Sequence, residues 1–263
     1  MSRLIFGTLL VLFVALSLFG CDMQRYPDVE DSAKKELLIY SGMTMVQPLM
    51  EVVSLVEEEQ QCRIKITYGG SGHICKSVEV NQLGDIFFPG CISYIEDFQG
   101  QGIVTDAVQV GYNEAVMFVE KGNPQQVESQ LDSLYDQRLN VVIGNDTSGA
   151  IGRETKRMLD AAGIYQQVAD NVLYMTTDSK GLALAMKNRD ADVVVNWKAI
   201  AYLPANREVT DVLKLPKGVA DKRPLVMGLL RYSKNPDLAR KVLAKASSVQ
   251  GQAIFRKYGF LDD

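Results

Sequence analysis

Three hydroxyl side chains follow short apolar segments, and each stands where an amphipathic segment with helical spacing begins: Thr44, Ser71 and Ser179. The first backbone N–H groups of a helix have no partner within the helix, and they carry a partial positive charge. A hydroxyl at this position can cap the helix, which is its commoner use, or it can join these N–H groups in donating hydrogen bonds to an anion. Because three such loops and Gly149-Ala150 all follow predicted strands of one alternating pattern, the sequence favours a shared anion site.

Other polar residues near these loops have both a functional and an ordinary interpretation. His73 could donate to an anion or respond to pH, although a single histidine in the first turn of a helix is more often solvated. Asp146 could accept a proton from a protonated ligand, but Asn-Asp-Thr-Ser is also ordinary turn chemistry. Arg153 is the nearest candidate countercharge, and we expect it on the solvent face of its helix. The glycines at 69, 70 and 72 suit a backbone that approaches a ligand closely, and they are also routine in tight turns.

Catalysis is disfavoured by the residues that would have to perform it. Ser71 and His73 are two positions apart at a helix start and point to different sides, and the sequence has no Gly-x-Ser-x-Gly motif. We therefore expect a protein that is not an enzyme. A small organic acid usually requires an arginine clamp, and no arginine falls inside the four loops. With one histidine and no Cys-x-x-Cys pair, no metal site or cofactor is expected.

The elements that must position these loops alternate between strand and helix. Continuous or alternating apolar segments predict strands, and apolar residues at helical spacing follow each loop. This pattern predicts an α/β fold with parallel sheets and helices on both faces, in which ligands bind beyond the carboxyl ends of the strands. The predicted strands are 37–40, 63–68, 85–88, 116–119, 141–144, 173–175 and 193–195, and the main helices are 45–59, 72–83, 152–162 and 178–188.

The N-terminal segment has a pattern typical of an export signal. Arg3 precedes an apolar run from Leu4 to Phe19, which is too short and too terminal for an ordinary membrane span. The run ends in Leu-Phe-Gly-Cys21, which resembles the bacterial lipobox. We therefore expect residues 1–20 to be a lipoprotein signal peptide and Cys21 to carry lipid, with a plain signal peptide or an uncleaved anchor as the alternatives. Asp22 resembles an inner-membrane retention signal, which predicts a lipid-anchored protein on the periplasmic face of the envelope.

The amino-acid composition limits the possible partners and predicts a tether and a core. Residues 21–35 are polar and without periodicity, which predicts a tether. The formal net charge of −4 argues against nucleic acid as a partner, and the 47% hydrophobic content supplies a sizeable core. Besides Cys21 the sequence has Cys62, Cys75 and Cys91. A Cys75–Cys91 disulfide and three buried thiols both remain open.

Five segments, in this order, resemble the periplasmic molybdate-binding proteins of ABC transporters. The likeness covers about residues 37–263 and implies the two-lobed periplasmic binding protein fold, with two parallel-rich sheets, flanking helices and a ligand cleft between the lobes. It implies residues 36–110 and 225–263 for lobe 1, residues 111–224 for lobe 2, and crossovers near 108–115 and 224–230. The five segments are IYSGMT at 39–44, YGGSG at 68–72, GDIF at 84–87, DSKGLAL at 178–184 and IFRKYGF at 254–260.

The same resemblance implies roles for individual residues. Family hydroxyls that bind the anion match Thr44, Ser71 and Ser179, and a backbone N–H donor matches the third loop, where we assign Ala150 and Ile151. A tyrosine that many molybdate binders supply falls on Asn196. An amide in place of a phenol predicts a different selectivity among anions, because the amide both donates and accepts.

The function implied is that of a monomeric binding lipoprotein that captures a tetrahedral oxyanion, such as molybdate or tungstate, and delivers it to an ABC permease. The alternative is a sensor or accessory lipoprotein of the same fold that binds sulfate, phosphate or a small organic acid without transport. The sequence alone does not decide between the two.

Overall fold

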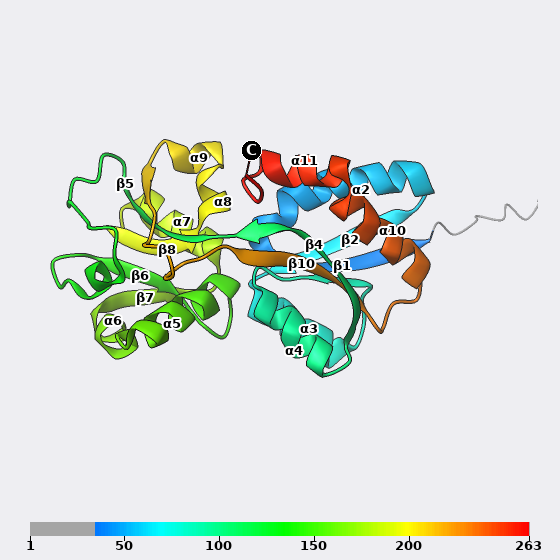
Figure 1. Ribbon diagram of the computed structural model, residues 1–263, viewed down its shortest axis with the longest axis horizontal. Coiled ribbons are helices and arrows are strands. Elements are labelled where there is room, and N and C mark those ends of the chain that lie inside the picture. The colour runs from blue at the N-terminus through cyan, green and yellow to red at the C-terminus, as the bar shows by residue number, and fades with distance from the viewer. Residues whose placement is uncertain (1–34, 263) are drawn as a thin grey trace, which may run out of the picture. The chain divides into compact units, whose positions relative to one another are not determined.

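The computed structural model describes residues 35–262, so the predicted signal peptide, tether and Cys21 lie outside the described residues. The described chain forms two five-stranded sheets, each flanked by helices on both faces (Figure 1). This arrangement confirms the predicted two-lobed α/β fold. We name the two parts lobe A and lobe B after the sheets on which they are built.

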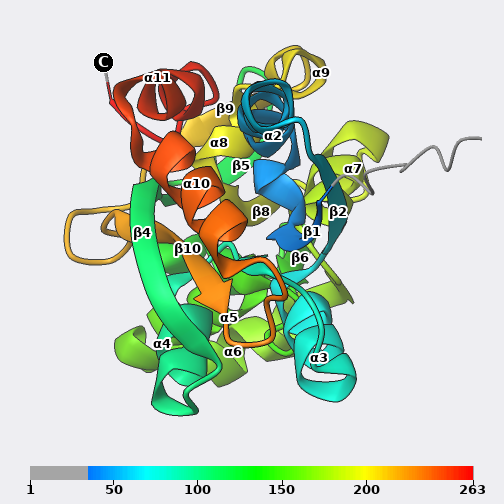
Figure 2. The same ribbon diagram turned by 90° about the vertical axis from the view of Figure 1, so that its right-hand side faces the viewer.

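Sheet A has the strand order β2-β1-β3-β10-β4. Strand β1 (Glu36–Gly42) pairs in parallel with β2 (Arg63–Gly69) and β3 (Ile86–Phe88), whereas β10 (Arg223–Leu230) pairs antiparallel with β3 and with β4 (Val104–Asn113). One face carries α2 (Val46–Gln60), α10 (Pro236–Ser247) and α11 (Val249–Lys257), and the other carries α3 (Ser71–Asn81) and α4 (Ile92–Gly100) (Figure 2). The short helix η2 (Met43–Met45) joins β1 to α2.

Sheet B has the strand order β7-β6-β8-β5-β9. Strand β6 (Val141–Gly144) pairs in parallel with β7 (Val172–Thr176) and β8 (Val193–Trp197), and β5 (Ala115–Glu120) pairs antiparallel with β8 and with β9 (Thr210–Leu213). The surrounding helices are η3 (Leu131–Tyr135), α5 (Ala150–Ala162), α6 (Tyr165–Asn171), α7 (Ser179–Asn188), α8 (Lys198–Ala201) and α9 (Pro204–Arg207).

The chain passes between the sheets at Glu114, between β4 and β5, and again along residues 214–222, between β9 and β10. The strands at these crossovers run against their neighbours, which makes each sheet mixed around a parallel centre. The expected lobe boundaries, 110/111 and 224/225, fall inside the last residues of β4 and the first residues of β10, and these two strand ends pair with each other.

Local sequence explains why the central elements form where they do. In α2 the buried residues Leu49, Val52, Val53 and Val56 recur at helical spacing and face the sheet. Every residue of β8 is buried, as expected for a central strand covered by helices on both faces. In lobe A, Phe255 of α11 makes edge contacts with the rings of Phe88 and Phe260, at centroid distances of 5.9 and 6.1 Å. The C-terminal segment is therefore part of the core of lobe A.

Cys75 and Cys91 are free thiols, so the disulfide between them, one of the two alternatives, is not formed. Cys91 is buried and Cys75 is half-buried, and burial raises the pKa of the Cys75 thiol to about 12. Within residues 35–262 no helix combines the length and the apolar character needed to cross a bilayer.

Candidate functional site

Loops that follow strands of both sheets meet around one cavity. The loops after β1, β2 and β3 belong to lobe A, and the loops after β6, β7 and β8 belong to lobe B. The volume of the cavity is about 10 Å³, room for about one water molecule. Its lining includes five of the six predicted binding residues. The lining residues are Gly42, Met43, Thr44, Met45, Gly69, Gly70, Ser71, Gly90, Ala150, Ile151, Asp178, Ser179 and Trp197.

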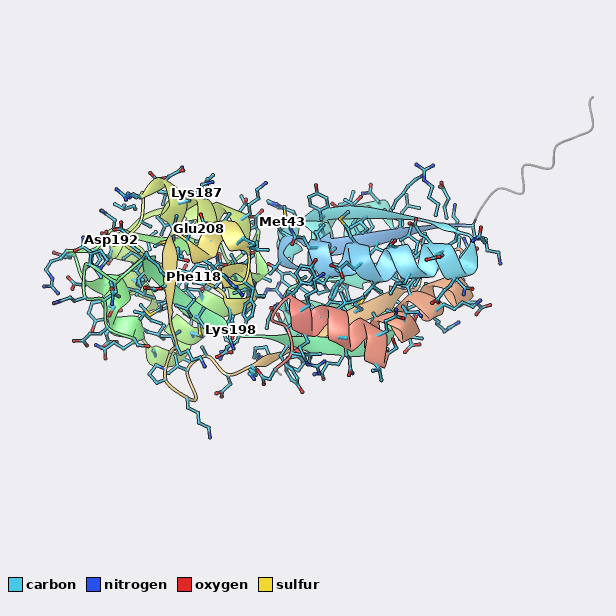
Figure 3. The ribbon with its side chains drawn as sticks, turned by 90° about the horizontal axis from the view of Figure 1, so that it is seen from above. Met43, Phe118, Lys187, Asp192, Lys198 and Glu208 are labelled. Carbon is cyan, nitrogen blue, oxygen red and sulfur yellow. The ribbon has the colours of Figure 1, made fainter. Side chains whose placement is uncertain are left out.

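Two of the predicted hydroxyls meet across the lobes. The Oγ1 of Thr44 lies 2.8 Å from the Oγ of Ser179, and either atom can be the donor. Ser179 is buried and Thr44 is partly buried, close to Met43, which lies where lobe A faces lobe B (Figure 3). One hydroxyl of the pair uses its proton in this bond, so the other keeps a proton that it can donate to a ligand.

The third hydroxyl, that of Ser71, is held in place by its neighbours in lobe A. Its Oγ accepts a hydrogen bond from the backbone N–H of Gly90 at 3.0 Å, and the carbonyl of Gly90 accepts one from the side-chain amide of Asn113 at 2.8 Å. All three residues are buried. A hydroxyl that accepts on one side retains its own O–H as a donor, so Ser71 is preset to donate.

The capping interpretation does not account for these hydroxyls. Helices η2 and α3 have the N-caps Gly42 and Gly70 and no side-chain capping bond, and α7 is capped by the carboxylate of Asp178 instead of Ser179. Thr44, Ser71 and Ser179 lie one or two residues inside these helices. Their side chains are therefore free of the role that helix termini most often give them.

Ala150 and Ile151 contribute backbone groups. They are the first two residues of α5, whose N-cap is Gly149 and which also has no side-chain capping bond. The N–H groups at these two positions precede the first turn of intrahelical hydrogen bonds, so they are available as donors at the cavity. Asp178 also lines the cavity, and its Oδ1 accepts from the N–H groups of Lys180 and Gly181 at 2.9 and 3.0 Å.

Asn196, the sixth predicted residue, is not among the lining residues. It is fully buried, its amide nitrogen donates to the carbonyl of Ser179 at 3.0 Å, and its Oδ1 accepts from the N–H of Trp197 at 2.8 Å. Both of its polar atoms are therefore bonded to protein. Alternate residues of a strand point to opposite faces, so a shift of one position places Trp197 at the cavity instead.

Gly90 and Trp197 also line the cavity, although no role was predicted for them. Gly90 lies two residues after β3, and Trp197 is the one tryptophan of the chain. A glycine shortly after a buried strand is a signal in the sequence that another group approaches the backbone closely.

The glycines of the loop after β2 serve the approach of the two lobes. A Cβ on Gly70 would lie 2.4 Å from the carbonyl oxygen of Ser148, and one on Gly72 would lie 1.9 Å from that of Thr147. The N–H of Gly72 donates to the carbonyl of Ser148 at 2.9 Å. These glycines allow the backbones of the two lobes to approach each other closely. From the sequence, we expected this backbone to approach a ligand instead.

The charged residues near the loops lie outside the cavity. His73 is exposed and Asp146 is partly exposed. Arg153 was expected on the solvent face of its helix, and its side chain is only partly there, with 37% of it exposed. Its guanidinium lies over the ring of Tyr94 at 3.6 Å and contacts Asp97 at 2.8 Å and Ser93 at 3.2 Å. These partners belong to α4 and its start, so Arg153 links α5 of lobe B to lobe A. Among the residues that line the described cavity there is no arginine or lysine.

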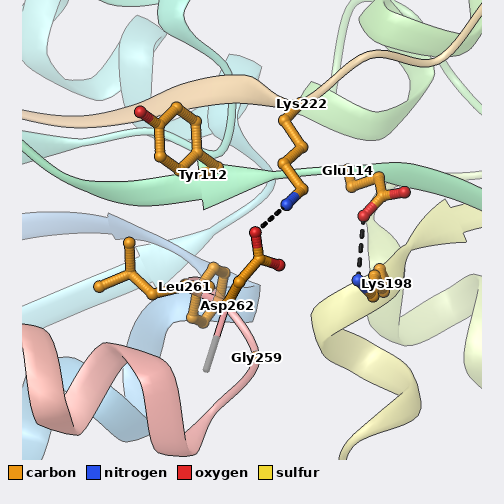
Figure 4. Close-up of a pocket in the computed structure, with 8 residues that line it drawn as sticks. Tyr112, Glu114, Lys198, Lys222, Gly259, Leu261 and Asp262 are labelled. Atoms are coloured by element: carbon orange, nitrogen blue, oxygen red, sulfur yellow. Dashed lines mark hydrogen bonds and ion pairs between the residues drawn. The ribbon is translucent and has the colours of Figure 1, made fainter. Parts of the chain in front are cut away.

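A second small cavity beside the crossovers has a different character (Figure 4). Its charged groups neutralise each other in pairs, Lys198 with Glu114 at 3.0 Å and Lys222 with Asp262. These pairs join both crossovers to α8 and to the C-terminal segment. Since its charged groups are already paired with each other, this cavity has fewer free groups to bind a ligand than the loops between the lobes.

Known proteins resemble this chain in sequence and in fold. The family model described as bacterial extracellular solute-binding protein matches residues 37–261. A Haemophilus influenzae protein that is named only as a binding protein is 26% identical over 226 residues, which cover 86% of this chain and 91% of the other.

Three solved structures have a similar fold. The molybdate-binding protein of Azotobacter vinelandii has a TM-score of 0.70 and 14% identity, over 86% of this chain and 99% of that chain. The sulfate-binding protein SubI of Mycobacterium tuberculosis has a TM-score of 0.73 and 15% identity, over 86% of each chain. A periplasmic thiamin-binding protein has a TM-score of 0.75 and 15% identity, over 87% of this chain and 83% of that chain.

Proposed function

Because this chain belongs to the bacterial extracellular solute-binding proteins, we propose that it captures a tetrahedral oxyanion of the molybdate or tungstate type and delivers it to an ABC importer. The observation that carries the choice of ligand is the set of three hydroxyls that meet at one cavity without capping their helices. Neutral donors and the uncapped starts of α3 and α5 suit a dianion, which offers only acceptors.

The donors surround the proposed ligand from both lobes. Thr44 and Ser71 come from lobe A, and Ser179, Ala150 and Ile151 come from lobe B. A ligand bound by all five favours closure of the lobes, because it binds the closed arrangement more tightly than the open one. A tetrahedral oxyanion is larger than a water molecule, so its entry requires Thr44 and Ser179 to exchange their mutual hydrogen bond for bonds to the anion.

The named ligands of the fold relatives are consistent with this choice but do not decide it. Two of the three solved structures are named for oxyanions, molybdate and sulfate, and the third is named for thiamin. Thiamin is a much larger organic cation, and hydroxyl and N–H donors around a small cavity do not suit it. Organic carboxylates usually require an arginine clamp, and the described cavity lining contains none.

A thermal-shift panel tests the proposal directly. The purified protein would be melted with molybdate, tungstate, sulfate, phosphate, thiamin and citrate. A ligand that binds only the native state stabilises it by about 2.7 kcal/mol at 100 times Kd, so Tm should rise by several degrees with molybdate or tungstate. A rise with thiamin or citrate and none with any oxyanion would contradict the proposal.

A further inference from the structure

We propose that the indole N–H of Trp197 donates a hydrogen bond to the bound anion and is a specificity-determining contact of the site. This inference rests on the proposed function, because it concerns the same cavity. Trp197 is the last residue of β8, at the carboxyl end of the central strand of sheet B, and its side chain lines the cavity while only 1% of its surface is exposed.

The position of the indole nitrogen follows from its distance to Gly90. The point that a Cβ on Gly90 would occupy lies 3.6 Å from the Nε1 of Trp197, 3.7 Å from the Oγ of Ser71 and 3.1 Å from the Cβ of Ala150. The indole nitrogen, the Ser71 hydroxyl and the start of α5 therefore surround the same point. These groups from both lobes lie close together at the cavity, where a bound anion would contact them.

The indole N–H is also an unused donor. Within residues 35–262 the backbone N–H of Trp197 donates to Asn196, but no hydrogen bond involves its Nε1. Tryptophan N–H groups in protein interiors usually have a hydrogen-bond partner. A ligand in the cavity is the partner that the arrangement of the lining offers.

The hydrogen-bonding chemistry of the indole determines which anions it favours. Indole only donates, whereas a hydroxyl or an amide also accepts. A fully deprotonated dianion presents acceptors on every side and therefore matches the indole. A hydrogen phosphate presents an O–H to part of the lining, and the indole cannot receive it. Trp197 should thus favour molybdate, tungstate or sulfate over phosphate.

Nuclear magnetic resonance can test the contact without a substitution, because the chain has a single tryptophan and therefore a single indole N–H signal. Saturating molybdate should move this signal downfield, as hydrogen bonding to an anion does. If calorimetry shows that the anion binds and the indole signal does not move, the Trp197 proposal is overturned and the proposed function stands. If no oxyanion binds, the proposed function itself fails.

Calorimetry on Trp197→Phe supplies the matching measurement. Phenylalanine keeps an aromatic ring but has no N–H, so the Kd for molybdate should rise roughly tenfold to a hundredfold. The preference over phosphate should fall. The control is Phe118→Leu, which removes buried aromatic volume from β5 of the same sheet at a residue that does not line the cavity, and it should leave Kd unchanged. Equal loss of affinity in both variants, or none in Trp197→Phe, would contradict the proposal.

Discussion

The polar side chains around the cavity divide into groups that face it and groups that hold those in place. Ser71 faces it, and Asn113 holds the Gly90 carbonyl behind Ser71. Ser179 faces it, and Asn196 holds the Ser179 carbonyl in the same way. In each case a buried asparagine donates an amide N–H to the backbone carbonyl of a residue that lines the cavity, so that this carbonyl is already bonded to protein. An acceptor pointing into an anion site would repel the ligand, so these asparagines support donation by their neighbours.

Removing single hydroxyls tests the site at the residue scale. We expect Thr44→Ala and Ser71→Ala each to weaken molybdate binding by a few-fold to a hundredfold, since a hydrogen bond to a charged group contributes about 1.5–3 kcal/mol. In Ser71→Ala the buried N–H of Gly90 also loses its acceptor, so the unfolding free energy without ligand should fall by about 1–3 kcal/mol. In Thr44→Ala only the partly buried bond to Ser179 is lost, so the unfolding free energy should fall by about 0.5–1.5 kcal/mol. Calorimetry measures the first quantity and chemical denaturation the second.

Ser77→Ala is the matched control for these variants. Ser77 lies on α3 with Ser71, but its hydroxyl donates to the carbonyl of His73 on the exposed side of the helix. Its replacement should leave the affinity unchanged. Wild-type affinity in both Thr44→Ala and Ser71→Ala would mean that these hydroxyls only pack the interface between the lobes.

At the scale of elements, α4 and α5 are joined by a contact that involves no ligand. Arg153 of α5 stacks on Tyr94 and pairs with Asp97, both on α4. Burial raises the pKa of Tyr94 to about 12, so its phenol is neutral and the stacking is between a cation and an uncharged ring. The contact can form only when the lobes are close, and it therefore favours the closed arrangement.

We expect Arg153→Met to weaken ligand binding by about two- to tenfold, although Arg153 does not line the cavity. The ion pair is partly exposed and contributes about 0.2–1 kcal/mol, and the cation–π contact adds about 0.5–1 kcal/mol. The difference in Kd between wild type and variant should shrink as salt is added, because the ion pair is screened. Lys156→Met is the control, since Lys156 pairs with Asp160 within α5. An unchanged Kd in Arg153→Met would show that this contact does not influence closure.

At the scale of the whole molecule, the C-terminal segment helps to join the lobes. Phe255 and Phe260 pack into lobe A, while a Cβ on Gly259 would lie 2.6 Å from the ring of Tyr202, which follows α8 of lobe B. Lys222, on the second crossover, pairs with Asp262 (Figure 4). The last residues of the chain thus contact both lobes beside the crossovers. Any opening of the lobes must bend the chain at these crossovers.

Export and anchoring also belong to this scale, and they remain predictions because Cys21 lies outside the described residues. We expect Cys21→Ser to lose lipid labelling and to appear in soluble periplasmic extracts, since lipid chains on the cysteine supply the membrane affinity. Cys75→Ser, which changes a half-buried thiol of the folded part, should stay in the membrane fraction. Membrane retention of Cys21→Ser would point to an uncleaved anchor instead.

The order of strands and helices could be predicted from the sequence because it depends on local periodicity. The apolar spacing in α2 and the continuous apolar run of β8 determine these elements wherever they pack. For the same reason the sequence could place Thr44, Ser71 and Ser179 at helix starts, and the alternating pattern could bring these starts to the carboxyl ends of strands. Five of six predicted binding residues consequently line one cavity.

Only the tertiary structure decided which side chains face that cavity and which face away. Asn196 and Trp197 are neighbours at the end of β8, and the twist and exit direction of the strand determine which of them reaches the cavity. Two contacts join the lobes: Gly72 lies close to Thr147, and Arg153 pairs with Asp97. Such contacts depend on how two separately folded sheets approach each other, and no local pattern in either segment encodes the distance between them.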